Sequence, residues 1–339
     1  MPLFLPEFNL ARVNTLASPV NAKAYVAVQN MTELVEAIKY ASEHDWPILP
    51  LGGGSNIVLT NDFPGLVIHL KLQGVQLEAE SEQAAWVRVQ AGENWHDFVV
   101  HSLLMGWYGL ENLSLIPGSA GAAPIQNIGA YGVELESVFE ELTALDIGSC
   151  LPVTFTRESC GFGYRDSVFK HRLRDRYIIT SVLLKLSKLP RLTLQYPALR
   201  DRVESLPAEQ VTPERVSALV CSIRSEKLPD PDDIPNVGSF FKNPVVGSEQ
   251  FAQLQRQWSD IVGYPQPNGR IKLAAAWLID RAGLKGMVMG AVAVHDKQAL
   301  VLTNPGRAVA SEIIALATKV QNTVLEQFGV KLEIEPRVY

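Results

Sequence analysis

The stretch from Pro117 to Gly132, PGSAGAAPIQNIGAYG, limits the possible fold more strongly than any other part of the chain. Its sixteen residues include four glycines and two prolines but no charged residue. This composition is too rich in glycine for a helix or strand and too apolar for a solvated linker, so it predicts a buried loop. Small residues at 118–123 would let backbone N–H groups approach an anion such as a phosphate or pyrophosphate. A tight crossover between two strands, packed on itself, is an equally good interpretation.

The size and charge of the chain restrict its class. A length of 339 residues exceeds one ordinary hydrophobic core and predicts two or three domains. The net charge of −6 disfavours a nucleic-acid partner, because binding a phosphate backbone requires a basic surface. The N-terminal residues lack the features of a signal peptide, and no later segment has about eighteen consecutive apolar residues. We therefore expect a cytoplasmic protein without a membrane partner.

Neither a disulfide framework nor a metal site is expected. Cys150, Cys160 and Cys221 are widely spaced and form no CxxC pair, which agrees with a reducing compartment. His96 and His101 fall on a predicted helix, but their spacing places them on different faces. No zinc-ligand spacing and no Ser/His/Asp order is present.

Residues 23–70 predict a βαβ-like unit that ends in a glycine turn. Strands are expected at 24–28 and 47–51, with a helix capped by Thr32 between them. The apolar stripe of this helix comprises Leu34, Ala37, Ile38 and Ala41. The second strand runs into Gly52-Gly53-Gly54-Ser55-Asn56, and a glycine cluster directly after a strand is typical of phosphate-binding turns. The pattern is not GxGxxG, and a plain β-turn is an equally good interpretation.

The remaining elements mix short strands with few helices, which predicts an α+β fold. The segment Leu228–Pro235 has three prolines and three aspartates in eight residues and marks a domain boundary. Before it we expect strands at 66–70, 75–79, 86–90, 138–147, 151–156 and 177–186 and a helix at 95–105. After it we expect helices at 272–282 and 309–327 and strands at 287–294, 299–303 and 330–335.

Two polar residues in apolar surroundings are candidates for chemistry. Ser239, in GSFFKNP with Lys242 and Asn243 close by, could donate a proton in a dry pocket, although a strand edge with a capped turn is the favoured interpretation. Arg165, in GFGYRDS, predicts a buried guanidinium with an anionic partner, which is either a ligand or the neighbouring Asp166.

Two pairs of charged residues leave their roles open. Glu333 and Glu335 share one face of the predicted last strand, where a solvated face is the simpler interpretation. Arg224 and Lys227 share a helix face and could form an anion site or a plain basic surface.

Taken together, these segments resemble the UDP-N-acetylenolpyruvoylglucosamine reductase (MurB) family over about residues 14–338. Tyr196 and Tyr264 resemble the tyrosines that close over substrate in the type I subgroup. The resemblance is carried by LGGGSN (51–56), AGENWHDFV (91–99), GLENLSLIPGSAGAAPIQNIGAYGVEL (109–135), GYRDSVFK (163–170), KLPDP (227–231), GSFFKNP (238–244), KLAAAWLID (272–280), HDKQALVL (295–302) and the LEIEPR tail.

The resemblance implies an FAD-binding fold of the vanillyl-alcohol-oxidase (PCMH) type with three domains. Two domains, 1–70 and 71–228 plus 329–339, would hold FAD, and an α/β domain at 229–328 would bind the substrate. NADPH would reduce the flavin, which would pass a hydride to the enolpyruvyl UDP-sugar and give UDP-N-acetylmuramate for peptidoglycan synthesis. Because the turn reads Gly54-Ser55-Asn56, without a histidine, the flavin is expected to be non-covalent.

The resemblance also assigns residues and favours the chemical interpretation of three of them. Ser239 would protonate C2 of the substrate, while Arg165 and Glu335 would polarise its carboxylate. Substrate contacts would come from Tyr131, Tyr196, Lys227, Asn243, Tyr264 and Gln298. Cofactor contacts would come from Gly52, Gly53, Gly54, Ser55, Asn56, Pro117, Gly118, Ser119, Gly121, Ala122, Ala123, Arg224 and Arg337. The family resemblance favours a monomer. Two alternative functions stay open: a flavin oxidase of the same fold, and a nucleotide-sugar binding module without flavin.

Overall fold

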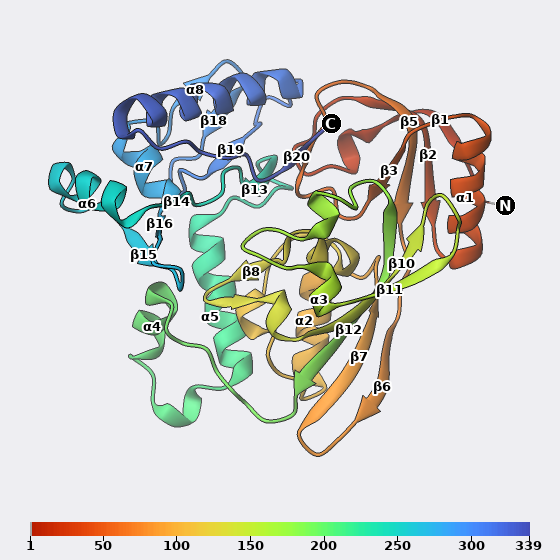
Figure 1. Cartoon of the computed structure of the whole chain (residues 1–339), viewed down its shortest axis with the longest axis horizontal. Helices are drawn as coiled ribbons and strands as arrows, with labels where there is room; N and C mark the ends of the chain where they lie inside the picture. Colours follow the sequence, from red (N-terminus) through yellow and green to blue (C-terminus); the bar gives the residue numbers. More distant parts are fainter. Residues whose placement is uncertain (1) are drawn as a thin grey trace. The chain divides into compact units, whose positions relative to one another are not determined.

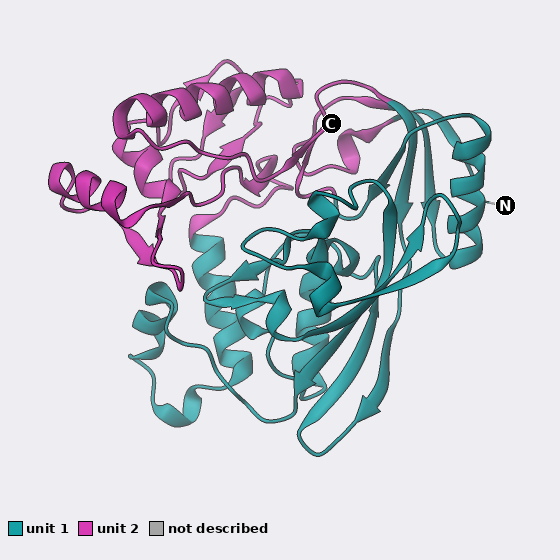
Figure 2. Ribbon diagram, in the orientation of Figure 1, with its two compact units in different colours: residues 1–8, 22–53, 64–226 teal, residues 9–21, 54–63, 227–339 magenta. Residues whose placement is uncertain are grey.

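A computed structural model describes residues 2–339 (Figure 1). The chain divides into two compact units (Figure 2). Unit 1 comprises Met1–Phe8, Ala22–Gly53 and Pro64–Glu226, and unit 2 comprises Asn9–Asn21, Gly54–Phe63 and Lys227–Tyr339. The three domains expected from the sequence stay a prediction. Within the described residues, no helix has the length and apolar character needed to cross a membrane.

The first sheet of unit 1 contains the predicted βαβ-like unit. Its strand order is β1(Leu5–Asn9), β2(Asn21–Val28), β5(Phe63–Leu70) and β3(Ile48–Leu51), with β3 and β5 parallel. Helix α1(Met31–Glu43) buries the predicted stripe, Leu34, Ala37, Ile38 and Ala41, against this sheet. The predicted cap was wrong: Asn30, not Thr32, accepts the N–H of Glu33, because Thr32 already lies in the first turn.

The second sheet of unit 1 is antiparallel and confirms the predicted strands. Its order is β11(Pro152–Thr156), β10(Phe139–Asp146), β12(Tyr177–Ser187), β7(Ala84–Gln90) and β6(Val75–Glu80), and Figure 1 shows these strands side by side. Helix α2(Trp95–Leu104) packs its buried Trp95 and Phe98 into the core beneath this sheet.

The glycine-rich stretch is buried only in part, since Pro117, Ala122 and Gly132 are exposed, and it is not a loop throughout. Residues Ala120–Gln126 form a 3-10 helix, η3, which ends at Asn127 in the left-handed conformation, with φ of 45°. A small hairpin follows, β8(Gly129–Ala130) with β9(Val133–Glu134). The loop prediction was wrong here because glycine and proline disfavour a long α-helix, whereas a short 3-10 helix tolerates them.

Three further helices of unit 1 lie on either side of β12 in the chain. They are α3(Arg157–Cys160), α4(Pro197–Val203) and α5(Pro213–Lys227), whose final residue belongs to unit 2. Leu199 of α4 packs against Val216, Val220 and Ile223 of α5, and Tyr131 lies against this cluster.

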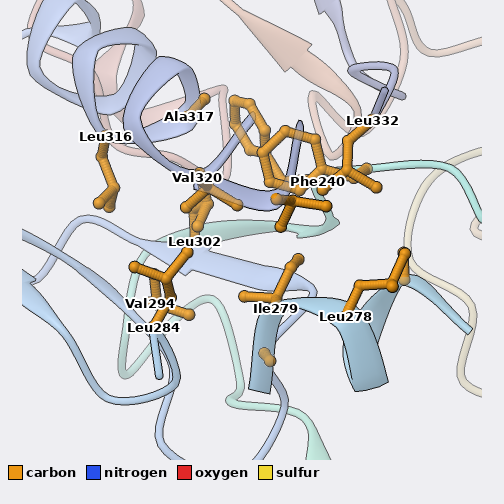
Figure 3. Close-up of a cluster of buried hydrophobic side chains, with 14 of the residues drawn as sticks. Phe240, Leu278, Ile279, Leu284, Val294, Leu302, Leu316, Ala317, Val320 and Leu332 are labelled. Carbon is orange, nitrogen blue, oxygen red and sulfur yellow. The ribbon is translucent and has the colours of Figure 1, made fainter. Parts of the chain in front are cut away.

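Unit 2 is built around one long helix. α8(Ala310–Phe328) packs Leu316 and Val320 over Val294, Leu302 and the buried Phe240 (Figure 3). Beneath it lies the sheet β13(Asn236–Ser239), β19(Val301–Thr303), β18(Val292–Val294) and β17(Val288–Met289), together with α7(Ala275–Arg281). A smaller sheet, β14(Val245–Val246), β16(Ile271–Leu273) and β15(Gly263–Pro265), adjoins α6(Ser248–Gln257).

Three predicted elements of unit 2 differ from the structure. The helix expected at 272–282 begins at Ala275, because the residues before it form β16. The strand expected at 287–294 is two strands, β17 and β18, that turn at Gly290, with φ of 61°. The tail at 330–335 buries alternate residues as predicted but forms only an isolated bridge between Ile334 and Phe241. The chain then pairs β20(Arg337–Val338) in parallel with β4(Ile57–Val58).

Candidate functional site

The two predicted phosphate-binding segments approach each other within unit 1. A Cβ atom built on Gly53 would lie 2.8 Å from Cα of Gly118, and one on Gly52 would collide with Oγ of Ser119. Gly118 itself has φ of 115°, a conformation that only glycine adopts readily. At this crossing, where Gly52 and Gly53 pass Gly118 and Ser119, glycine is therefore required at positions 53 and 118.

The crossing concentrates backbone donors without protein partners. Among the described residues, the N–H groups of Gly52, Gly53, Gly118 and Ser119 form no hydrogen bond. Farther along the same stretch, the N–H groups of Ala120, Gly121 and Ala122 all bond to backbone carbonyls, at 2.9, 3.0 and 3.0 Å. Closely spaced N–H groups without side chains between them suit a phosphate or pyrophosphate. The N–H groups at the crossing therefore suit the predicted anion, and the other predicted cofactor contacts stay a prediction.

Gly121 is needed for packing, since a Cβ atom there would lie 2.5 Å from that of Ala91.

The end of the first glycine turn belongs to unit 2. A Cβ atom on Gly54, which has φ of 64°, would lie 2.8 Å from Cα of Asn14, and the Gly54 carbonyl accepts the N–H of Thr15 at 3.1 Å. The carbonyl of Asn56 accepts the N–H of Arg337 at 3.0 Å. The guanidinium of Arg337 lies 4.3 Å from the ring centroid of Tyr339. The C-terminal segment thus holds the last residue of the predicted turn.

Two side chains fix the backbone just before the second glycine segment. Leu115 has φ of 57°, which is unfavourable for a leucine. Its N–H donates to Nδ1 of His96 at 3.0 Å, and its carbonyl accepts from Nε of Arg224 at 3.2 Å. Burial lowers the pKa of His96, and the charge of Arg224 lowers it further, although Asp97 opposes this change. The neutral ring can therefore accept the Leu115 N–H, a role for His96 that the sequence did not suggest.

Arg165 lies beside the β8–β9 hairpin. Its Nη2 donates to the carbonyl of Gly129 at 2.6 Å, and its guanidinium lies 5.5 Å from the ring centroid of Tyr164. Asp166, the alternative partner considered for Arg165, instead accepts from Nε2 of His171 at 2.7 Å.

Two predicted substrate-binding tyrosines of unit 1 are in contact. The ring centroids of Tyr131 and Tyr196 are 5.0 Å apart in an edge-to-face arrangement. Beneath them, the side chain of Asn112, only 1% exposed, donates to the carbonyls of Tyr131 at 2.9 Å and Thr193 at 2.8 Å. Asn112 thus joins the two segments that carry the tyrosines. Its position inside the GLENLSL motif was the only sequence signal, and the sequence reasoning missed it.

In unit 2 the segments of Ser239 and Glu335 are adjacent. The N–H of Glu335 donates to the carbonyl of Phe240 at 2.9 Å, and Ser239 pairs with Val301 of β19. The N–H of Phe240 in turn donates to the carbonyl of Leu300 at 2.7 Å, which brings in the loop that carries Gln298. Glu333 differs from Glu335, because its side chain is 71% exposed and lies 3.7 Å from Nζ of Lys242.

The remaining predicted residues of unit 2 are spread over its smaller elements. Oδ1 of Asn243 accepts the N–H of Ala275 at 2.9 Å, at the start of α7. Tyr264 lies on the small strand β15, and Lys227 is the last residue of α5. Of the predicted catalytic residues, Arg165 therefore belongs to unit 1, and Ser239 and Glu335 to unit 2. The described residues contain no group of three or more His, Cys, Asp or Glu side chains that could hold a metal ion.

Comparisons with known proteins cover the whole chain. The family model for the C-terminal domain of UDP-N-acetylenolpyruvoylglucosamine reductase matches residues 230–339, and that for an FAD binding domain matches 22–148. The UDP-N-acetylenolpyruvoylglucosamine reductase of Pseudomonas syringae pv. tomato is 47% identical over 98% of this chain and 97% of its own length. The enzyme of the same name from Pseudomonas aeruginosa is 47% identical over 100% of both chains.

Solved structures agree with these relatives. The MurB reductase from Thermus caldophilus matches with a TM-score of 0.69 and 25% identity, over 100% of this chain and 99% of that chain. The 6-hydroxy-D-nicotine oxidase from Arthrobacter nicotinovorans is similar in fold, with a TM-score of 0.51 and 12% identity over 98% and 87% of the two chains. These matches confirm the predicted α+β fold with an FAD-binding part.

Proposed function

We propose a reaction for this chain from its family, since it belongs to the UDP-N-acetylenolpyruvoylglucosamine reductase family of FAD oxidoreductases. It would reduce enolpyruvyl-UDP-N-acetylglucosamine to UDP-N-acetylmuramate, with NADPH as the reductant. The observation that carries this proposal is the crossing of Gly52 and Gly53 with Gly118 and Ser119. It provides four unused N–H donors inside the range that matches an FAD binding domain.

The cofactor would be held mainly by backbone. The crossing carries no lysine, so the diphosphate of FAD would be neutralised by N–H dipoles rather than by a side-chain cation. Arg224, which is half-buried and donates from Nε to the carbonyl of Leu115 at 3.2 Å, would supply a positive charge beside that segment. Arg337 would contribute from the C-terminal segment next to Asn56.

The chemistry that FAD supplies when bound is hydride transfer from NADPH to C3 of the enolpyruvyl group. The protein would have to manage the charge and the proton on the substrate. We assign the proton at C2 to the hydroxyl of Ser239, and the polarisation of the substrate carboxylate to Arg165 and Glu335. The assignment of Ser239 together with Glu335 is supported by the hydrogen bond between the Glu335 and Phe240 backbones, which holds Glu335 beside the serine segment.

Binding of the UDP-sugar is assigned to the remaining predicted residues. Tyr131 and Tyr196 would act as a pair, because Asn112 joins their segments. Lys227, Asn243, Tyr264 and Gln298 would contribute from unit 2. A location in the bacterial cytoplasm and a monomeric state are part of this proposal, and light scattering during gel filtration tests the latter.

A visible spectrum of the purified protein tests the function. We expect a flavin spectrum that bleaches on anaerobic addition of NADPH and returns on addition of the enolpyruvyl UDP-sugar. Reoxidation by oxygen but not by the UDP-sugar would indicate a flavin oxidase instead. A colourless protein that takes up no FAD would indicate a binding module and overturn the proposal.

A further inference from the structure

The loop between β18 and β19 is closed on itself by backbone hydrogen bonds. The N–H of His295 donates to the carbonyl of Val301 at 2.9 Å, and the N–H of Val301 donates to the carbonyl of Gln298 at 3.0 Å. Val301 is also the residue that pairs with Ser239. Gln298 therefore lies in the loop directly before β19, the strand that pairs with the segment of the predicted proton donor.

The imidazole of His295 completes this closure. Its Nδ1 lies 3.2 Å from the backbone nitrogen of Gln298, and its Nε2 lies 3.4 Å from Oδ1 of Asp296. Because a backbone N–H can only donate, Nδ1 must be unprotonated to accept it, and the ring proton is then on Nε2, facing Asp296. The imidazole side chain is only 12% exposed, so water does not readily replace this acceptor.

The side chain of Gln298 is held by the same loop. Its Oε1 accepts the N–H of Leu300 at 3.4 Å, and the carbonyl of Leu300 accepts the N–H of Phe240. With Oε1 directed at the backbone, the side-chain NH₂ group of Gln298 is the part left to meet a ligand. The direction of this NH₂ group thus depends on the 295–301 loop, whose first turn is fixed by His295.

The surroundings favour the neutral ring. Burial lowers the pKa of His295, Asp296 raises it, and Lys297 lowers it. These are the charged groups that act on the imidazole, and the net change is downward from the ordinary histidine value. At neutral pH the ring is therefore an acceptor, and acidification converts it to a cation with two donors.

We propose that His295 is a positioning residue for the UDP-sugar: its unprotonated Nδ1 fixes the 295–301 loop so that Gln298 meets the substrate, and protonation of the ring releases Gln298. This inference rests on the proposed function. Its kinetic consequence is that the KM for the UDP-sugar rises at acidic pH, whereas reduction of the bound flavin by NADPH does not change through this group. A merely structural histidine would affect both half-reactions or neither.

Two substitutions separate the acceptor from the shape of the side chain. His295→Asn places a carbonyl oxygen on Cγ, where Nδ1 is, but cannot titrate. His295→Gln places its oxygen one bond farther out. We expect His295→Asn to keep the wild-type KM at pH 8 and to lose the acid-dependent rise attributable to this ring. His295→Gln should raise the KM about fivefold at pH 8, the usual effect of losing one hydrogen bond.

Two exposed neighbours allow a test that leaves His295 intact. Asp296→Asn removes the charge that raises the His295 pKa, so the acid limb of the KM profile should move to lower pH. Lys297→Met removes a charge that lowers this pKa, so the limb should move to higher pH. Melting temperature and flavin content, measured for every variant, confirm folding.

The outcomes distinguish the two levels of the proposal. A wild-type protein that does not reduce the UDP-sugar at pH 8 would overturn the proposed function. A wild-type protein that turns over normally, but whose KM profile is unchanged in His295→Asn and in both neighbour variants, would overturn only the role of His295.

Discussion

Gly53 and Gly118 pass so close to each other that a Cβ atom on Gly53 would lie 2.8 Å from Cα of Gly118. The neighbouring residues are also close, although a Cβ atom on Gly52 would meet Oγ of Ser119, a side-chain atom that can rotate away. With no side chains on Gly52, Gly53 and Gly118, four backbone N–H groups, including that of Ser119, lie close together, and none of them bonds to another described residue. Sterics and anion binding thus impose the same sequence requirement here.

The first prediction concerns this crossing. Gly53→Ala should weaken FAD binding at least about fivefold, because overpacking by one methyl group costs about 1–3 kcal/mol and separates the two segments. Fluorescence titration of the apoprotein with FAD measures the change. Gly247→Ala is the control, since a Cβ atom there meets no atom within 4 Å and φ is unremarkable at −69°. Equal affinities for FAD in both variants would contradict the proposed FAD contacts at the crossing.

The second prediction concerns stability and pH. His69 is buried on β5, bonds to the hydroxyl of Tyr25 at 2.7 Å, and also contacts the backbone of Gly52. Burial lowers the pKa of His69 to about 4, with a smaller contribution from Lys71, while the bond to Gly52 opposes the change. Because the unfolded chain binds this proton more readily, the stabilising effect is complete above about pH 6.5 and is lost as pH falls towards 4.

Urea unfolding between pH 7 and pH 4 measures this effect. The free energy of unfolding should fall by about 3 kcal/mol through this group, and His69→Gln should remove that part of the slope. Tyr25→Phe should keep the slope, because the ring stays buried and titratable. A slope that is the same in His69→Gln and the wild type would rule out His69 as its source.

Sequence patterns predicted best where a structure depends on neighbours along the chain. The stripe of Leu34, Ala37, Ile38 and Ala41 follows helical spacing, and α1 buries it. The alternation in 330–335 gave the correct burial, with Val330 and Leu332 inside, but not the hydrogen bonding. Burial depends on the residue's own side chain, whereas a strand also requires a partner over several residues.

The candidate site was less accessible from sequence patterns. Ser239 and Glu335 are far apart in the chain, and in the sequence only the family resemblance connects them. In the structure, the hydrogen bond between the Glu335 and Phe240 backbones does so. In the sequence, nothing distinguishes Asn112 from other polar loop residues. Its role follows from its hydrogen bonds to the carbonyls of Tyr131 and Thr193. Such roles depend on long-range geometry that residue spacing does not encode.

The third prediction concerns Asn112. Asn112→Leu keeps the approximate size but leaves two partly buried carbonyls without donors, at a cost of about 1 kcal/mol or more. We expect a higher KM for the UDP-sugar, about tenfold, because the Tyr131 and Tyr196 segments are no longer joined. Ser114→Ala is the control, since it breaks a nearby buried pair, Ser114 Oγ to Ser217 Oγ at 2.7 Å, without touching either tyrosine segment. Steady-state kinetics and melting temperatures of both variants separate positioning from general loss of stability.

The fourth prediction concerns proton donation. Ser239→Ala should leave reduction of the bound flavin by NADPH intact and slow its reoxidation by the UDP-sugar about 10²- to 10⁴-fold, the usual contribution of a general acid. Stopped-flow absorbance measures each half-reaction separately.

Glu335→Gln should also slow the second half-reaction, because Glu335 is held beside the serine segment through Phe240. Glu333→Gln is its control, since that side chain is 71% exposed and should be neutral in both steps. If Ser239→Ala slowed both half-reactions equally, the serine would be needed for the integrity of the site and not as the proton donor.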